Sequence, residues 1–343
     1  MPWQTIGQEP ARRFLARSIE VGRVAHAYLL TGPANSGKTT LALDFARALI
    51  CTGSPRPCDV CPECRMVLGA GHPDVEQIEG DEDEAAEFSA LWKSGSGERP
   101  RRALPIVRVR ELIRVMATRP SQAAYRVATL DGSMLQDTAA SALLKLFEEP
   151  ASRAVLLLRA PAVETVPPPI TSRCQLVRLA PVPSRQIELW LKETLGVSDD
   201  DAAVYSALAG GRPGLAKRLA SSGGHAPLDA QIALWLELTA ADTVTRLDQA
   251  AVWSRNFPAA RAALDLAVLV WHQLVQLAAA GGAASTVAGS SPLPAFQTLP
   301  AQRLRDRGVV ALAAQLTLIA RASRLLDANV QPRLALEWLM LEL

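Results

Sequence analysis

The sequence feature that most constrains this chain is a glycine-rich loop at residues 32–39, which reads Gly-Pro-Ala-Asn-Ser-Gly-Lys-Thr. An apolar run at 27–30 precedes the loop, and apolar residues recur at helical spacing over 41–49 after it. Strand, glycine loop and helix in this order are the context of a phosphate-binding loop. The sequence therefore predicts an α/β domain that binds a nucleoside polyphosphate, either ATP or ADP.

The loop positions have separate expected roles. Gly32 and Gly37 let the backbone turn tightly, so that successive N–H groups face one anion, and the helix that starts near Lys38 adds the positive end of its dipole. We expect Lys38 to reach the β- and γ-phosphates and Thr39 to hold Mg²⁺. The full predicted nucleotide site consists of Gly32, Asn35, Ser36, Gly37, Lys38, Thr39, Thr40 and Asp131.

Strand and helix patterns alternate up to residue 180, which predicts a parallel sheet with helices on both faces. We expect further strands at 74–78, 125–130, 154–158 and 175–179, and helices at 107–118 and 138–149. Asp131 follows the strand at 125–130, and phosphate-loop proteins place a Mg²⁺ ligand at the end of such a strand.

Four of the five cysteines, Cys51, Cys58, Cys61 and Cys64, follow the spacing C-x6-C-x2-C-x2-C. Four thiolates satisfy a tetrahedral Zn²⁺ with no open position, so this cluster predicts a structural zinc site. An iron–sulfur cluster and unligated thiols are the alternatives, whereas the thioredoxin-like context of a redox pair is absent. Cys174 lies far away in the sequence and is expected to be a small buried residue.

Composition excludes several classes of protein. A net charge of +2 gives no strong nucleic-acid footprint, and the 49% of hydrophobic residues is ample for buried cores. No apolar stretch of membrane-spanning length is free of charge, and the first residues lack a secretory signal, so we expect a cytoplasmic protein and no membrane partner. The charged, Gly/Ser-rich segment 80–102 predicts a mobile surface loop, and 279–300 predicts a second loop.

After Pro181 the pattern becomes helical. Three short helices are expected at 187–195, 200–208 and 213–219, and the chain from about 227 onward has no strand pattern.

Several short strings carry a resemblance to a known family. Ile-Gly-Gln at 6–8 and His-Ala-Tyr at 26–28 flank the loop, and Gly-His-Pro-Asp at 71–74 follows the cysteines. Ala-Leu-Leu-Lys-Leu-Phe-Glu-Glu-Pro stands at 142–150 and Ser-Arg-Cys at 172–174. In this order and spacing they resemble the clamp-loader branch of the AAA+ ATPases, and within it the delta-prime subunits of bacterial DNA polymerase III. The resemblance covers residues 3–180 and, more weakly, the rest of the chain.

The resemblance implies three domains: an AAA+ nucleotide-binding domain at 1–180 with a zinc module at 51–64, a helical lid at 181–225 and a helical collar at 226–343. It implies a hetero-pentamer with gamma/tau and delta subunits, which loads the sliding clamp onto primer-template DNA. It also implies that Arg173 is an arginine finger acting on the neighbouring subunit's ATP. The alternative for Arg173 is a surface ion pair.

Three departures from the family pattern predict weak or absent ATP hydrolysis. Asp131 is followed by Gly-Ser-Met, so the second carboxylate that activates water is missing. Arg159 stands where the motor subunits place a small polar residue, and the register of Arg212 fits the family's lid arginine poorly. The chain thus resembles a stator, and the alternatives are a gamma/tau-like motor subunit and an independent phosphate-loop repair ATPase.

Overall fold

The structure is a computed structural model that describes residues 3–78, 104–221, 225–255, 257–279, 302, 305–327 and 330–343. The described residues form two compact units. The first contains the chain up to Pro183 together with Arg212–Gly214, and the second contains the remainder of the chain after Pro183. The loop expected at 80–102 and, beyond Ala279, the loop expected at 279–300 lie outside the described residues.

The first unit is built on a five-stranded sheet with the order β2-β3-β4-β1-β5, in which every neighbouring pair is parallel. The strands are β1 (Ala27–Thr31), β2 (Val75–Ile78), β3 (Arg126–Asp131), β4 (Ala154–Ala160) and β5 (Gln175–Arg178). All five residues of β1 are buried, as expected for a central strand covered on both faces.

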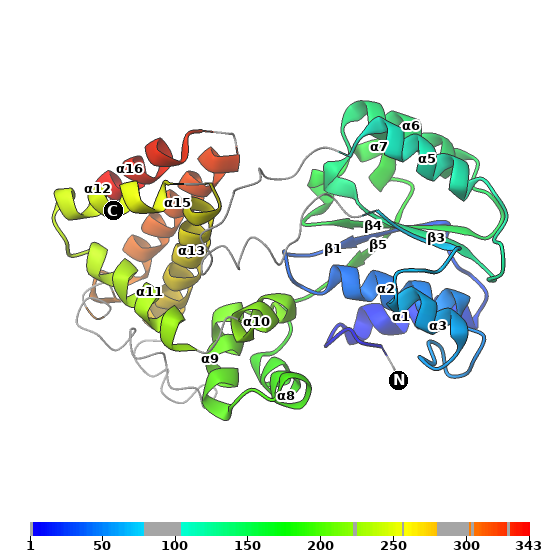
Figure 1. Ribbon diagram of the computed structural model, residues 1–343, viewed down its shortest axis with the longest axis horizontal. Helices are drawn as coiled ribbons and strands as arrows, with labels where there is room; N and C mark the ends of the chain where they lie inside the picture. The colour runs from blue at the N-terminus through cyan, green and yellow to red at the C-terminus, as the bar shows by residue number, and fades with distance from the viewer. Residues whose placement is uncertain are drawn as a thin grey trace. The chain divides into compact units, whose positions relative to one another are not determined.

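Helices cover both faces of this sheet (Figure 1). On one face lie α1 (Glu9–Glu20) and α2 (Lys38–Ile50), and on the other lie α5 (Ile106–Met116), α6 (Asp137–Glu148) and α7 (Pro168–Thr171). Buried residues of α5 recur at Val109, Leu112 and Met116, the three-or-four spacing of an amphipathic helix. The predicted parallel sheet with helices on both faces is confirmed.

All described elements of the second unit are helices. They are α8 (Ser184–Leu195), α9 (Asp199–Ala209), α10 (Pro213–Ala220), which begins in the first unit, α11 (His225–Leu238), α12 (Thr243–Trp253), α13 (Phe257–Ala279), α15 (Gly308–Asp327) and α16 (Pro332–Glu342). Three tryptophans pack together in this unit. The ring centroid of Trp235 lies 4.5 Å from that of Trp253 and 5.9 Å from that of Trp271. The indole N–H of the buried Trp271 donates to Gln315 at 3.1 Å, so its polar atom is satisfied.

Within α15, residues Gly308–Leu326 are long and apolar enough, by length and composition alone, to cross a membrane, with a mean hydropathy of 1.5. The helix packs against α13 and α16, and its residues Leu312, Ile319 and Ala322 are buried. A helix in the core of a water-soluble protein passes the same test, so this one is weak evidence for a membrane span.

The predicted elements occur where the sequence placed them, with ends displaced by one to three residues. The strand predicted at 154–158 extends to Ala160, and the helix predicted at 187–195 begins at Ser184. Along the sequence, the first unit gives way to the second after Pro183. The division into three domains at 180 and 225 stays a prediction.

Candidate functional site

The glycine loop joins β1 to α2 as predicted. Asn35 and Gly37 adopt left-handed backbone with φ of 64° and 96°, a region that glycine enters without strain. A Cβ on Gly32 would lie 3.1 Å from both Leu179 Cβ and Ser36 Oγ, so the close approach of the chain requires glycine there.

The amine of Lys38 lies against the loop. Its Nζ donates to the carbonyl oxygens of Gly32 and Pro33, both at 2.8 Å. Lys38 and Thr39 open α2, and Thr40 follows in the same turn with a half-buried side chain. The structure thus brings the predicted loop residues together at one helix start.

Two observations fit a polyphosphate in this loop. The Ser36 hydroxyl oxygen is buried and has no hydrogen-bond partner among the described residues. Gly37 is the N-cap of α2 and has no side chain to cap the first-turn N–H groups of the helix. Phosphate oxygens are acceptors that would satisfy both sets of donors, and the helix dipole favours their charge.

The carboxyl ends of β3 and β4 complete this edge of the sheet. Asp131 and Arg159 are direct partners across the parallel strands. One carboxylate oxygen of Asp131 accepts from the backbone N–H and the hydroxyl of Ser133, at 2.9 and 2.6 Å, and so caps the short 3-10 helix Gly132–Met134. One oxygen of the Asp131 carboxylate is therefore already engaged with its own turn.

Arg159 is the residue whose position the sequence did not predict. Its Nη1 donates to the hydroxyl oxygen of Thr39 at 2.7 Å. A Mg²⁺ ion on Thr39 would share that oxygen with a permanent cation, so the arrangement does not fit the predicted Mg²⁺ site. The alternation of side chains along the strand could have predicted this contact. Arg159 is on the same face of the sheet as Val155 and Leu157, and that face packs against α2.

The four clustered cysteines converge as predicted. The sulfur atoms of Cys51, Cys58, Cys61 and Cys64 all lie within 4.8 Å of one another. Four thiolates on one Zn²⁺, each at about 2.3 Å from the ion, are separated by about 3.8 Å, so the donor set fits a tetrahedral ion.

Backbone N–H groups support the thiolate form at this cluster. Those of Gly53, Cys61 and Cys64 donate to the sulfurs of Cys51, Cys58 and Cys61 at 3.3–3.4 Å. Burial opposes charge on Cys61, but the backbone N–H groups of Cys64 and Thr52 and the neighbouring thiols outweigh burial and lower the pKa of Cys61 to about 6. Burial raises the pKa of Cys64 to about 12, so a metal is needed to hold that thiol as a thiolate.

A buried arginine ties the cysteine module to α2. The guanidinium of Arg47 is 1% exposed and forms ion pairs with Asp44, one turn earlier, and with Asp59 in the cysteine loop. Asp44 also accepts from the backbone N–H groups of Gln4 and Thr5, at 3.1 and 2.8 Å. This network was not predicted, although a charged pair three positions apart within an apolar helix face was its visible signal.

A second buried carboxylate links the module to the sheet. Asp74 accepts from three consecutive backbone N–H groups at 121–123 and from Arg126 Nη2. Burial opposes its charge, but these donors outweigh burial and hold the pKa of Asp74 below its usual range. His72 Nδ1 accepts from the Asp74 N–H, so its Nε2 carries the proton and donates to Glu63 at 2.6 Å.

Arg173 lies away from the loop, just after α7. Its side chain is 39% exposed, with Nη1 on the Pro169 carbonyl oxygen at 3.0 Å and Nη2 on Glu148 at 3.3 Å. Cys174 is half-buried, and burial raises its pKa to about 12. Near the loop, the N–H of Gly214 donates to the Asn35 carbonyl oxygen at 2.9 Å.

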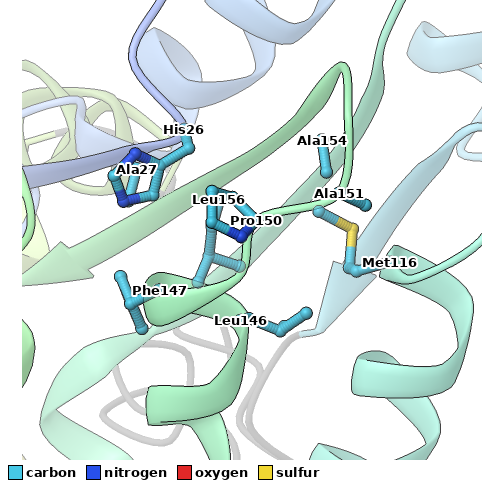
Figure 2. Close-up of a pocket in the computed structure, with 9 residues that line it drawn as sticks. All are labelled: His26, Ala27, Met116, Leu146, Phe147, Pro150, Ala151, Ala154 and Leu156. Atoms are coloured by element: carbon cyan, nitrogen blue, oxygen red, sulfur yellow. The ribbon is translucent and has the colours of Figure 1, made fainter.

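A small apolar hollow lies between α5, α6 and the amino-terminal ends of β1 and β4, lined by His26, Met116, Phe147 and Leu156 among others (Figure 2). Its cavity volume of about 10 Å³ admits at most one water molecule. The buried Nε2 of His26, which has no partner among the described residues, is the polar atom that such a water would satisfy. The hollow is therefore too small for a ligand.

Comparison with known proteins identifies the family. A family model described as "DNA polymerase III, delta subunit" matches residues 7–183. Subunit delta' of Pseudomonas aeruginosa DNA polymerase III is 32% identical over 206 residues, which are 58% of this chain and 57% of that protein. Subunit gamma/tau of Mycobacterium tuberculosis is 31% identical over 205 residues, 58% of this chain and 32% of that protein. Subunit tau of Bacillus subtilis is 30% identical over 173 residues, 50% of this chain and 27% of that protein.

The chain therefore spans between about a quarter and just over half of the length of these relatives. The delta' and gamma/tau relatives match it at nearly equal identity, so identity alone does not separate the two roles. The family model covers more than half of the chain, together with the loop and the cysteine module. This protein accordingly belongs to the DNA polymerase III delta subunit family and is a clamp-loader-type subunit.

Proposed function

We propose that this chain is a delta-prime-type stator of the DNA polymerase III clamp loader, which binds a nucleotide and hydrolyses it weakly or not at all. The observation that carries the proposal is a complete phosphate loop with, among the described residues, a single carboxylate at the end of β3. Asp131 is followed by Gly132–Met134, which supply no second acid, and its own oxygen is engaged by Ser133. A water at the γ-phosphate would lack a general base.

Different residues of the chain bind the nucleotide and the metal ion. The N–H groups at the start of α2, the Ser36 hydroxyl and the Lys38 amine bind the phosphates and orient them. Bound ATP supplies a transferable phosphoryl group, but nothing in the loop withdraws a proton from water. Four thiolates hold a structural Zn²⁺ that closes the module at 51–64.

Arg173 acts on the next subunit in this proposal. Its exposed pairing with Glu148 at 3.3 Å is of a kind that contributes at most about 1 kcal/mol, so phosphate oxygens on a neighbour can displace the carboxylate. A guanidinium delivered in this way stabilises charge on the transferring phosphoryl group and is worth about 10³–10⁵ in rate.

The partners follow from the family. The chain joins gamma/tau and delta subunits in a hetero-pentamer in the cytoplasm, and that complex loads the sliding clamp onto primer-template DNA. No dense basic stripe marks the sequence, so contact with DNA is made through the complex rather than by the isolated chain.

The test is reconstitution with the motor subunits, followed by ATPase and clamp-loading assays. Arg173→Ala should leave nucleotide binding by this chain unchanged and reduce the ATPase of the assembly at least about tenfold. Glu148→Ala is the matched control, because it removes the ion pair and keeps the guanidinium. Equal losses in the two variants would show that only the surface ion pair matters.

The near-equal similarity to gamma/tau subunits favours a motor subunit as the second candidate function. A motor predicts that the purified chain, or its homo-oligomer, hydrolyses ATP at the rate of the assembled loader. An ATPase that never assembles with loader subunits would instead support an independent phosphate-loop enzyme.

A further inference from the structure

Arg159 brings a permanent positive charge to the nucleotide loop. It is the second-last residue of β4, opposite Leu30 of β1 on one side and Asp131 of β3 on the other. Both neighbouring strands end at the same edge of the sheet, where β1 leads into the glycine loop. The guanidinium therefore enters the site from the sheet, beneath the start of α2.

The contacts of Arg159 leave part of its donor set unused. Nη1 donates to Thr39 Oγ1 at 2.7 Å and Nη2 to the Ile78 carbonyl oxygen at 3.4 Å. The residue is 9% exposed, and its Nε is buried without a hydrogen-bond partner in the part of the chain that the structure describes. Among the described residues, no carboxylate lies within 4.0 Å of its nitrogens. A guanidinium stays charged when buried, so this one has positive charge available for an anion.

A divalent cation is disfavoured at the same place. Mg²⁺ binds a hydroxyl oxygen at about 2.1 Å. If it bound Thr39 Oγ1, it would lie within about 5 Å of Arg159 Nη1, where two positive charges repel. Asp131, which lies opposite Arg159 across the strands, accepts from Ser133 through one carboxylate oxygen. Each of the two predicted metal ligands thus has an oxygen that already accepts a hydrogen bond from a protein group.

We propose that Arg159 supplies the positive charge that a divalent cation supplies in other phosphate loops, so that this chain binds a nucleoside polyphosphate free of divalent metal. The inference rests on the proposed nucleotide binding and specifies its ligand. Lys38 contacts the phosphates from the loop side, and Arg159 contacts them from the sheet side together with the orphaned Ser36 hydroxyl. A site of this kind holds ATP without preparing it for hydrolysis, because no metal bridges the phosphate oxygens.

Calorimetric titration of the full chain with ATP, in excess EDTA or in excess MgCl₂, tests the proposal. The wild-type chain should bind ATP in EDTA at least as tightly as in Mg²⁺. Arg159→Asn should weaken binding in EDTA by about ten- to a hundredfold, the loss expected for a hydrogen bond to a charged group, and Mg²⁺ should then restore part of it. Arg159→Lys keeps the charge without the planar donor fork and should fall between the two.

Two further variants separate the possible outcomes. Arg114→Asn removes an exposed arginine from α5, on the opposite face of the sheet, and should change neither titration. Lys38→Ala should abolish binding in both conditions. Wild-type binding that requires Mg²⁺ overturns the inference and leaves the nucleotide site standing, whereas no binding in either condition overturns both. Thermal unfolding of each variant checks its fold, and if Arg159→Asn does not fold, the wild-type comparison and Arg159→Lys still decide the question.

Discussion

Replacing Asp74 by asparagine should destabilise the first unit by about 4 kcal/mol. Its two oxygens accept four donors at 2.6–2.9 Å, the N–H groups at 121–123 and the Arg126 guanidinium. Asparagine keeps one acceptor oxygen, so two of the four donors would face its amide NH₂ group instead. Each orphaned donor costs about 1–3 kcal/mol, so two of them cost about 4 kcal/mol.

Amide hydrogen exchange of peptides from β3 measures this loss, because it reports the opening of the first unit separately from the second. Glu111→Gln is the control, since this exposed carboxylate of α5 is paired only across 3.4 Å with Arg108 and should change stability by less than about 0.5 kcal/mol. A loss below about 1 kcal/mol for Asp74→Asn would refute the assignment of Asp74 as a buried hub.

The same carboxylate gives a pH dependence of known sign. The pKa of Asp74 is lower in the folded chain than in the unfolded one, so its contribution to stability is fully present above the unfolded pKa of about 3.9. That contribution is lost as the pH falls through the folded pKa. The stability difference between wild type and Asp74→Asn should therefore shrink on acidification, and a difference that grows would contradict the argument.

Two further predictions concern the cysteine module and the loop. The purified chain should carry about one zinc ion, and the Cys64→Ser variant should lose the ion and about 4 kcal/mol or more of its free energy of unfolding. Metal analysis and chemical unfolding measure the two effects, and a metal-free chain of full stability would contradict a structural zinc site. Gly37→Ala should lower the free energy of unfolding by about 1–2 kcal/mol, because alanine is strained at a φ of 96°. The cost comes from the backbone and not from a clash, since the nearest atom to the new Cβ, on Thr5, is 3.9 Å away. An unchanged unfolding midpoint would mean that the loop adopts another backbone conformation.

Local features of this chain could be predicted from the sequence because their residues are close in the chain. The glycine loop needs only six consecutive residues between a strand and a helix, and the cysteine module closes within one turn-rich segment. The buried strand β1 was predictable because a central parallel strand must be apolar on both faces.

Contacts between distant segments could not be predicted. The hydrogen bond from Arg159 to Thr39 joins residues 120 positions apart and depends on β4 lying beside β1. The spacing of apolar residues predicts strands but does not predict their order in the sheet. The same holds for Asp74, whose three N–H donors lie 47–49 residues further along the chain. The trans role of Arg173 depends on a neighbouring subunit and stays a prediction.

The ion pair between Arg47 and Asp59 has a consequence for modularity. The cysteine module occupies one short segment of the chain after α2, yet its Asp59 neutralises Arg47, a residue of the helix that follows the phosphate loop. A descendant or an engineered chain that deleted residues 51–64 would leave Arg47 with a charge that Asp44 alone must balance in a dry interior. Loss of the cysteine module therefore requires a second substitution at position 47. Relatives that lack the four cysteines should accordingly also lack the arginine at this position.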